Sequence, residues 1–158
     1  MRQISYRRVE PVTVYAARID APGPGPDNVG PAIATVMPAF NEALIDAGRP
    51  LLEPGIFWYE PHDDSPELTV HVSFRAEDPP VPGDGYEVVT LPAVDTMAVL
   101  VHAGDMTGIG DSWGRLMEGV AADGYRIVGP CREVYLEAGD PEPGPDWVTE
   151  LQAPVERG

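Results

Sequence analysis

Hydrophobic residues recur along the chain with two periods, and each period predicts one kind of element. Over residues 68–75 every second side chain is apolar, which predicts a strand with one polar side. Runs rich in β-branched and aromatic residues predict further strands at residues 5–19, 55–60, 129–136 and 147–152. A further strand region at residues 86–102 is interrupted at Leu91 and Pro92. Residues 29–47 and 111–123 instead carry apolar side chains at helical spacing. The expected N-caps of these helices are Asn28 and Asp111, and their expected ends are Gly48 and Gly124.

The predicted elements occur twice in the same order. Gly48 precedes Pro54 by the same number of residues as Gly124 precedes Pro130, and a strand follows each proline. The same shift pairs Phe40 with Leu116, Phe57 with Glu133 and Tyr59 with Tyr135. Such self-similarity is typical of an internal duplication. The sequence therefore predicts a single domain over residues 1–158, made of two β-α-β-β repeats at about 1–78 and 84–158 that are related by a pseudo-two-fold axis.

The strand at 129–136 carries an unusual polar residue. With a period of two, Cys131, Glu133 and Tyr135 share one side of it. Burying an unpaired carboxylate costs several kcal/mol, so Glu133 is solvated, paired with an arginine, or part of a cavity that receives a cationic or hydrogen-bonding guest. The arginines considered for such a pair are Arg75, Arg126 and Arg132. Our hypothesis is the cavity.

The duplication also assigns the sides of these strands. We expect a helix to cover the mostly apolar side, formed by Ile56, Trp58, Arg132 and Val134. We expect the other side to line a concave cleft between the repeats. Aromatic rings around one carboxylate suit a flat or lipophilic cation, through cation–π attraction and charge pairing. The candidate ligand-binding residues are Glu133, Tyr135, Phe57, Tyr59, Trp113 and Cys131, and core packing is the alternative for the aromatic ones.

Other reactive residues do not form a familiar site. Nothing in the sequence predicts a depressed pKa for Cys131, so we expect it to line the cleft rather than act as a nucleophile. His62, His71 and His102 lie in different elements, without the paired spacing of a metal site. Residues 104–110 lack the lysine and the strand-turn-helix spacing of a phosphate-binding loop. We therefore expect no metal and no cofactor.

Composition limits the partners. The 158 residues include 26 acidic and 10 basic side chains, all of the latter arginine, for a formal net charge of -16. This charge repels nucleic-acid phosphate and anionic membranes, so we expect no direct nucleic-acid and no membrane partner. Attraction of cations and simple solubility explain the charge equally well. The single cysteine excludes a disulfide within the chain, and no apolar run approaches the ~20 residues of a membrane span, so we expect a cytoplasmic protein.

Several short motifs follow one another along the chain: Leu91-Pro92-Ala93, Val101-His102-Ala103-Gly104, Trp113 with Leu116, Gly129-Pro130, Arg132-Glu133-Val134-Tyr135, and Trp147 to Gln152. Together with the duplication they resemble the GyrI-like family, which is also met as the effector-binding domain of AraC-type and MerR-type multidrug-responsive regulators. The resemblance covers essentially the whole chain. It implies an α+β fold with an antiparallel sheet, two helices and a central pocket that recognises diverse lipophilic, often cationic, compounds. In that pocket Glu133 would be the central carboxylate.

Three functions follow as hypotheses. The leading one is capture of lipophilic or cationic small molecules, with a separate regulatory protein as a further candidate partner. The second is hydrolysis of an electrophilic, cyclopropane-type natural product. The resemblance implies it, because some stand-alone members of the GyrI-like family are similar to hydrolases that open such compounds. Glu133 would then be the general base and Tyr135 the hydrogen-bond donor. The third is an acidic interaction or inhibitor module.

Overall fold

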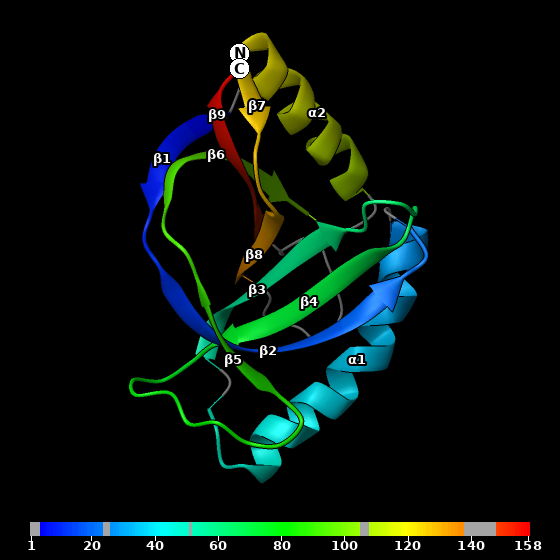
Figure 1. The fold of residues 1–158 in the computed structure, drawn as a ribbon, viewed down its shortest axis with the longest axis vertical. Helices are drawn as coiled ribbons and strands as arrows, with labels where there is room; N and C mark the ends of the chain where they lie inside the picture. Colours follow the sequence, from blue (N-terminus) through cyan, green and yellow to red (C-terminus); the bar gives the residue numbers. More distant parts are fainter. Residues whose placement is uncertain (1–3, 24–25, 51, 105–107, 138–147) are drawn as a thin grey trace. The chain divides into compact units, whose positions relative to one another are not determined.

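The computed structural model describes residues 4–23, 26–50, 52–104, 108–137 and 148–158 (Figure 1). Within them the order of helices and strands follows the prediction, apart from a division of the first predicted strand and one additional short strand. The chain divides into two compact units. The first unit is Pro11–Pro92, and the second unit combines Met1–Glu10 with Ala93–Gly158. That all 158 residues act as one domain stays a prediction.

The first unit is an antiparallel sheet with a helix on one face. The sheet order is β3-β4-β2-β5, and its strands are β2 (Val12–Ala21), β3 (Leu52–Pro61), β4 (Leu68–Arg75) and β5 (Glu87–Leu91). Helix α1 (Pro26–Asp46) packs on β2 and β4 (Figure 1). Phe40 of α1 stacks on Phe74 of β4 with ring centroids 5.8 Å apart. The apolar side predicted for residues 68–75 is therefore the side that faces α1.

The second unit repeats this plan. Its antiparallel order is β8-β9-β6-β1, and its elements are β1 (Ser5–Val9), β6 (Val94–Ala103), β7 (Tyr125–Ile127), β8 (Cys131–Glu137), β9 (Val148–Arg157) and helix α2 (Ile109–Ala122). The short β7, which the sequence pattern does not predict, pairs with β9. Leu116 and Val120 of α2 pack against Leu100 and Leu151 of the sheet to form the core. The predicted start of the last strand, Trp147, lies outside the described residues.

Strand pairing confirms the duplication. Trp58 lies opposite His71 in the first unit, as Val134 lies opposite Glu150 in the second. In the same way β5 pairs with β2, and β1 pairs with β6. Each unit therefore takes its fourth strand from the start of the other repeat.

This exchange corrects the predicted strand at residues 5–19. The strand ends at Val9 and a new one begins at Val12, and the two belong to different units. Pro11 lies at the change, where its missing N–H and fixed φ do not suit the middle of a continuous strand.

Both helices end just before the predicted glycines. Gly48 has a φ of 73°, and its N–H donates to the carbonyl of Ile45 at 3.0 Å. The N–H of Arg49 donates to the carbonyl of Leu44 at 2.8 Å, which completes a Schellman motif. Gly124 has a φ of 83° just beyond α2. Each glycine is required because other residues rarely adopt a positive φ.

The beginnings of the helices differ from the prediction. Asn28 lies inside α1, which begins at Pro26, because the fixed φ of proline suits the first helical position. Asp111 lies in the first turn of α2 rather than at its N-cap. In the first turn its charge still complements the helix dipole. Met117 of α2, although apolar, is exposed.

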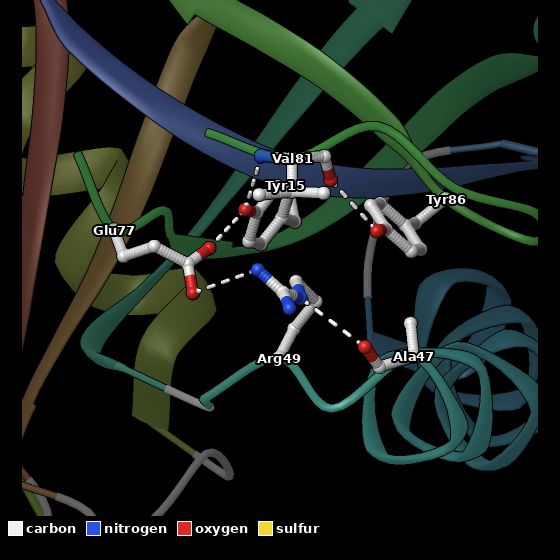
Figure 2. Close-up of polar contacts among 6 residues, drawn as sticks. All are labelled: Tyr15, Ala47, Arg49, Glu77, Val81 and Tyr86. Atoms are coloured by element: carbon white, nitrogen blue, oxygen red, sulfur yellow. Dashed lines mark hydrogen bonds and ion pairs between the residues drawn. The ribbon is translucent and has the colours of Figure 1, made fainter. Parts of the chain in front are cut away.

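A polar cluster fixes the segment after β4 to the rest of the first unit (Figure 2). The fully buried Tyr15 donates its hydroxyl proton to Glu77 and accepts the N–H of Val81 at 2.8 Å. Arg49 Nη1, just beyond the end of α1, donates to the other oxygen of Glu77 at 3.3 Å. Burial, together with the hydrogen bond to Glu77, raises the pKa of Tyr15, so its hydroxyl stays protonated and donates. The cluster therefore joins β2, α1 and residues 76–81.

We predict that Glu77→Gln lowers the free energy of unfolding by about 1–2 kcal/mol, because the variant loses charge-assisted hydrogen bonds to both partners. Glu156→Gln is the matched control. Glu156 also pairs with an arginine, Arg126, but at an exposed position where such pairs contribute about 0–1 kcal/mol. Urea unfolding measures both. Equal losses in the two variants would contradict the structural role of the cluster.

Candidate functional site

Glu133 is held between two hydrogen-bond donors on the side of its sheet that faces α2. It lies directly opposite Leu151, a fully buried residue of the α2 core. Trp113 of α2 donates its indole N–H to Oε2 at 2.8 Å, and Tyr135 donates its hydroxyl proton to Oε1 at 2.6 Å. Only 7% of Glu133 is exposed. Three of the candidate residues predicted from the sequence are therefore in direct contact.

The predicted sides of the strand are reversed. The apolar side with Arg132 and Val134 was expected under a helix, whereas α2 covers the side with Glu133, as the contact from Trp113 shows. Apolar character did not distinguish the two sides, because Arg132 and Val134 are buried as well. The carboxylate of Glu133 can be buried under α2 because Trp113 of this helix donates a hydrogen bond to it.

The two donors explain how a carboxylate occupies a buried position. Removing a charge from water is costly unless hydrogen bonds replace the lost hydration. Glu133 accepts a hydrogen bond on each oxygen, and these two donors belong to aromatic side chains that are only partly buried. A cation beside Glu133 would meet a negative charge next to an indole and a phenol. The arrangement is suited to binding a cation.

Cys131 lies two residues before Glu133 and packs against the α2 core. Burial, and then the negative charge of Glu133, raise the pKa of its thiol to about 11. Because the thiolate is the nucleophilic form, this thiol is unreactive at neutral pH. The expectation that nothing lowers its pKa is confirmed, and its place in the wall of a ligand site stays a prediction.

Phe57 and Tyr59 belong to the first unit. Tyr59 lies opposite Val70, so Phe57 and Tyr59 are on the side of the sheet that faces α1. This position again reverses the predicted side, for which α1 was expected over Ile56 and Trp58. The role of Phe57 and Tyr59 as ligand walls, and the cleft predicted between the repeats, stay predictions.

Further polar residues lie under α2. His102 Nδ1 and Ser112 Oγ are 2.7 Å apart, and Arg115 donates to Ser112 at 2.8 Å. Thr149 lies opposite Tyr135 on one neighbouring strand and opposite His102 on the other. The sequence pattern singles out His102 only as a metal ligand and as part of a family motif, includes Thr149 only in the motif Trp147 to Gln152, and does not single out Ser112. The duplication carried a signal for Ser112, which it pairs with Val36, whereas only the strand pairing aligns His102 and Thr149 with apolar residues.

The other histidines considered as metal ligands have polar neighbours of their own. His62 Nε2 is 2.9 Å from Thr69 Oγ1, and His71 Nε2 is 2.6 Å from Glu60 Oε1. Among the residues that the structure describes, no three His, Cys, Asp or Glu side chains gather as they would around a metal ion. Within the same residues, neither helix combines the length and the apolar character needed to cross a membrane.

The fold is that of a domain built from two β-α-β-β repeats, with a buried polar centre under α2 in the second unit. The family model of the GyrI-like small molecule binding domain matches residues 4–156. The chain belongs to this family, as its motifs suggested. No curated protein matches it.

Several solved structures share the fold. The C-terminal domain of EcmrR matches with a TM-score of 0.78 and 19% identity, over 99% of this chain and 98% of that one. SAV2435 bound to tetraphenylphosphonium matches with a TM-score of 0.68 and 14% identity, over 98% and 94%. A hydrolase encoded by lin2189 of Listeria innocua matches with a TM-score of 0.58 and 14% identity, over 98% and 92%. At these identities the likeness shows the fold alone.

We predict that alkylation of Cys131 by iodoacetamide in the folded protein keeps accelerating with pH up to about 11, because only the thiolate reacts. In the unfolded chain the rate should level off above about pH 9. Glu133→Gln should move the inflection of the folded protein to lower pH, since the charge of Glu133 contributes to the raised pKa. Mass spectrometry of timed reactions measures the rates. A plateau near pH 9 in the folded protein would contradict the assignment.

Proposed function

We propose that this protein binds lipophilic cations on the α2 side of the second unit, and that the charge of Glu133 is the main recognition element. The observation that carries the proposal is a carboxylate only 7% exposed, held by the indole of Trp113 and the phenol of Tyr135. Attraction between charges strengthens as water is excluded, so a cation that pairs with Glu133 there gains more than it would at the surface. The aromatic rings add cation–π attraction.

Access to the carboxylate runs past the two aromatic donors. Trp113 and Tyr135 are both partly exposed, whereas Glu133, to which both donate, is buried. A ligand reaches Glu133 by displacing one of these side chains, and its positive charge replaces the hydrogen bond that is lost. Cys131, with an unreactive thiol, forms an apolar part of the wall.

Two further observations support a cationic ligand. SAV2435, which has the same fold, was solved with tetraphenylphosphonium, a lipophilic cation. The formal net charge of -16 favours the approach of cations over anions. A cytoplasmic location and a separate regulatory protein as partner complete the proposal.

Hydrolysis is the second candidate function. The hydroxyl of Tyr135 lies 2.6 Å from Glu133, so a base and a hydrogen-bond donor are adjacent in the same place. With Glu133 as general base and Tyr135 as donor to the developing negative charge, a bound electrophile would be opened by water. Such a protein would consume its ligand, whereas a binding protein returns it unchanged.

We predict that Glu133→Gln weakens tetraphenylphosphonium binding by about 10- to 100-fold, the loss expected when one partner of a buried charge pair is removed. The same change should alter binding of neutral triphenylphosphine oxide by less than about threefold. Quenching of tryptophan fluorescence measures both affinities, and mass spectrometry of each mixture shows whether the ligand is recovered unchanged.

Glu150→Gln is the matched control for this experiment. Glu150 is as buried as Glu133 but lies opposite Val134, on the other side of the sheet, where it pairs with Arg7. Its substitution removes the same charge and should leave tetraphenylphosphonium binding within about threefold. Equal losses for cation and neutral compound in Glu133→Gln would contradict charge recognition. Consumption of ligand that requires Glu133 would establish the hydrolase instead.

A further inference from the structure

The two repeats allow the layer under α2 to be compared with an equivalent layer under α1. Strand pairing fixes the correspondence between them. In the first unit one row across the sheet is Tyr59, Val70 and Ile19, and in the second unit the equivalent row is Tyr135, Thr149 and His102. A tyrosine, a valine and an isoleucine under one helix therefore correspond to a tyrosine, a threonine and a histidine under the other.

Next to this row, polar residues of the second unit again replace apolar residues of the first. Glu133 takes the place of Phe57 in the next row of the sheet. On the helices, the pairing of Phe40 with Leu116, both buried, places Ser112 where α1 has Val36. The first unit builds this layer from apolar side chains, so packing alone does not require polar ones. Departures from a rule that the rest of the fold obeys are expected at functional positions.

Thr149 is the residue of this group that packing explains least. It is 0% exposed, and its Oγ1 has no hydrogen-bond partner among the groups that the structure describes. A buried hydroxyl without a partner lowers stability, and a valine of the same shape stands at the equivalent Val70. The hydroxyl of Thr149 therefore lowers stability, which indicates a role other than packing.

A small hydrogen-bond network holds the side chain of His102, which lies opposite Thr149, in place. A guanidinium can only donate, so Ser112 accepts from Arg115. The hydroxyl proton of Ser112 is then available to Nδ1 of His102, since Oγ and Nδ1 are 2.7 Å apart. His102 itself is only 7% exposed. The surroundings of the Thr149 hydroxyl are thus fixed before any ligand arrives.

We propose that Thr149 is a second contact of the ligand site, and that its hydroxyl forms a hydrogen bond with a hydroxyl or carbonyl oxygen of the ligand. The inference rests on the proposed function and narrows it to lipophilic cations that carry such an oxygen. Thr149 lies one strand across and two residues along from Glu133. The ligand oxygen therefore lies roughly 7 Å from the positive charge.

The test compares tetraphenylphosphonium with its ortho-, meta- and para-hydroxyl derivatives, which share charge and shape. The wild type should bind the para or meta isomer about three- to tenfold more tightly than the parent, the value of one added hydrogen bond. Thr149→Val should remove this preference and leave the parent cation within about twofold. Thr149→Ser, which keeps the hydroxyl, should retain the preference.

Thermal unfolding supplies a readout that needs no ligand. Thr149→Val should leave the Tm unchanged or raise it, whereas the reverse change at the equivalent position, Val70→Thr, should lower it by at least ~2 °C. A fall in Tm for Thr149→Val would reveal a structural partner for the hydroxyl and overturn the inference.

The binding data separate the two levels of the proposal. Equal binding of the parent and all three derivatives by the wild type, or a preference that survives Thr149→Val, would overturn the role of Thr149 and leave cation binding intact. Failure of the wild type to bind any of these cations would reject the proposed function and the role of Thr149 together.

Discussion

A buried carboxylate is the constraint on which the second unit depends. Glu133 stays out of water because an indole from α2 and a phenol from its own strand replace the hydration that it loses. This requirement ties the position of the helix to the register of the strand, since a slip of β8 by one residue would turn Glu133 to the other side of the sheet. Packing of Leu116 against Leu151 holds α2 in the place where Trp113 can reach the carboxylate. Fold and site are therefore parts of one arrangement.

The duplication divides structural and chemical roles between two versions of the same unit. Under α1 the layer is apolar, and the unit is secured by a polar cluster of Tyr15, Glu77 and Arg49 at the end of the helix. Under α2 the equivalent layer carries acceptors and donors in place of apolar side chains. The two units keep the same strand pairing and glycine-terminated helices although the side chains of this layer differ.

Much of this could be predicted from the sequence, because it rests on local rules. Hydrophobic periods and terminal glycines predicted the strands, the helices and their repetition, and a carboxylate in the middle of a strand identified Glu133 as unusual. The side covered by the helix could not be predicted, since both sides of β8 hold buried residues and the donor of Trp113 comes from a distant segment. Thr149 was missed because threonine is ordinary in a strand. Its significance depends on the pairing that aligns it with Val70 and places it beside His102.

The most direct measurement of the central claim is a crystal structure of the protein with tetraphenylphosphonium. We predict that the phosphorus lies within about 6 Å of the Glu133 carboxylate on the α2 side, the range in which opposite charges stabilise each other strongly, with Trp113 or Tyr135 displaced from its hydrogen bond. A cation bound at another place, with the hydrogen bonds to Glu133 intact, would contradict the claim that this buried charge recognises the ligand.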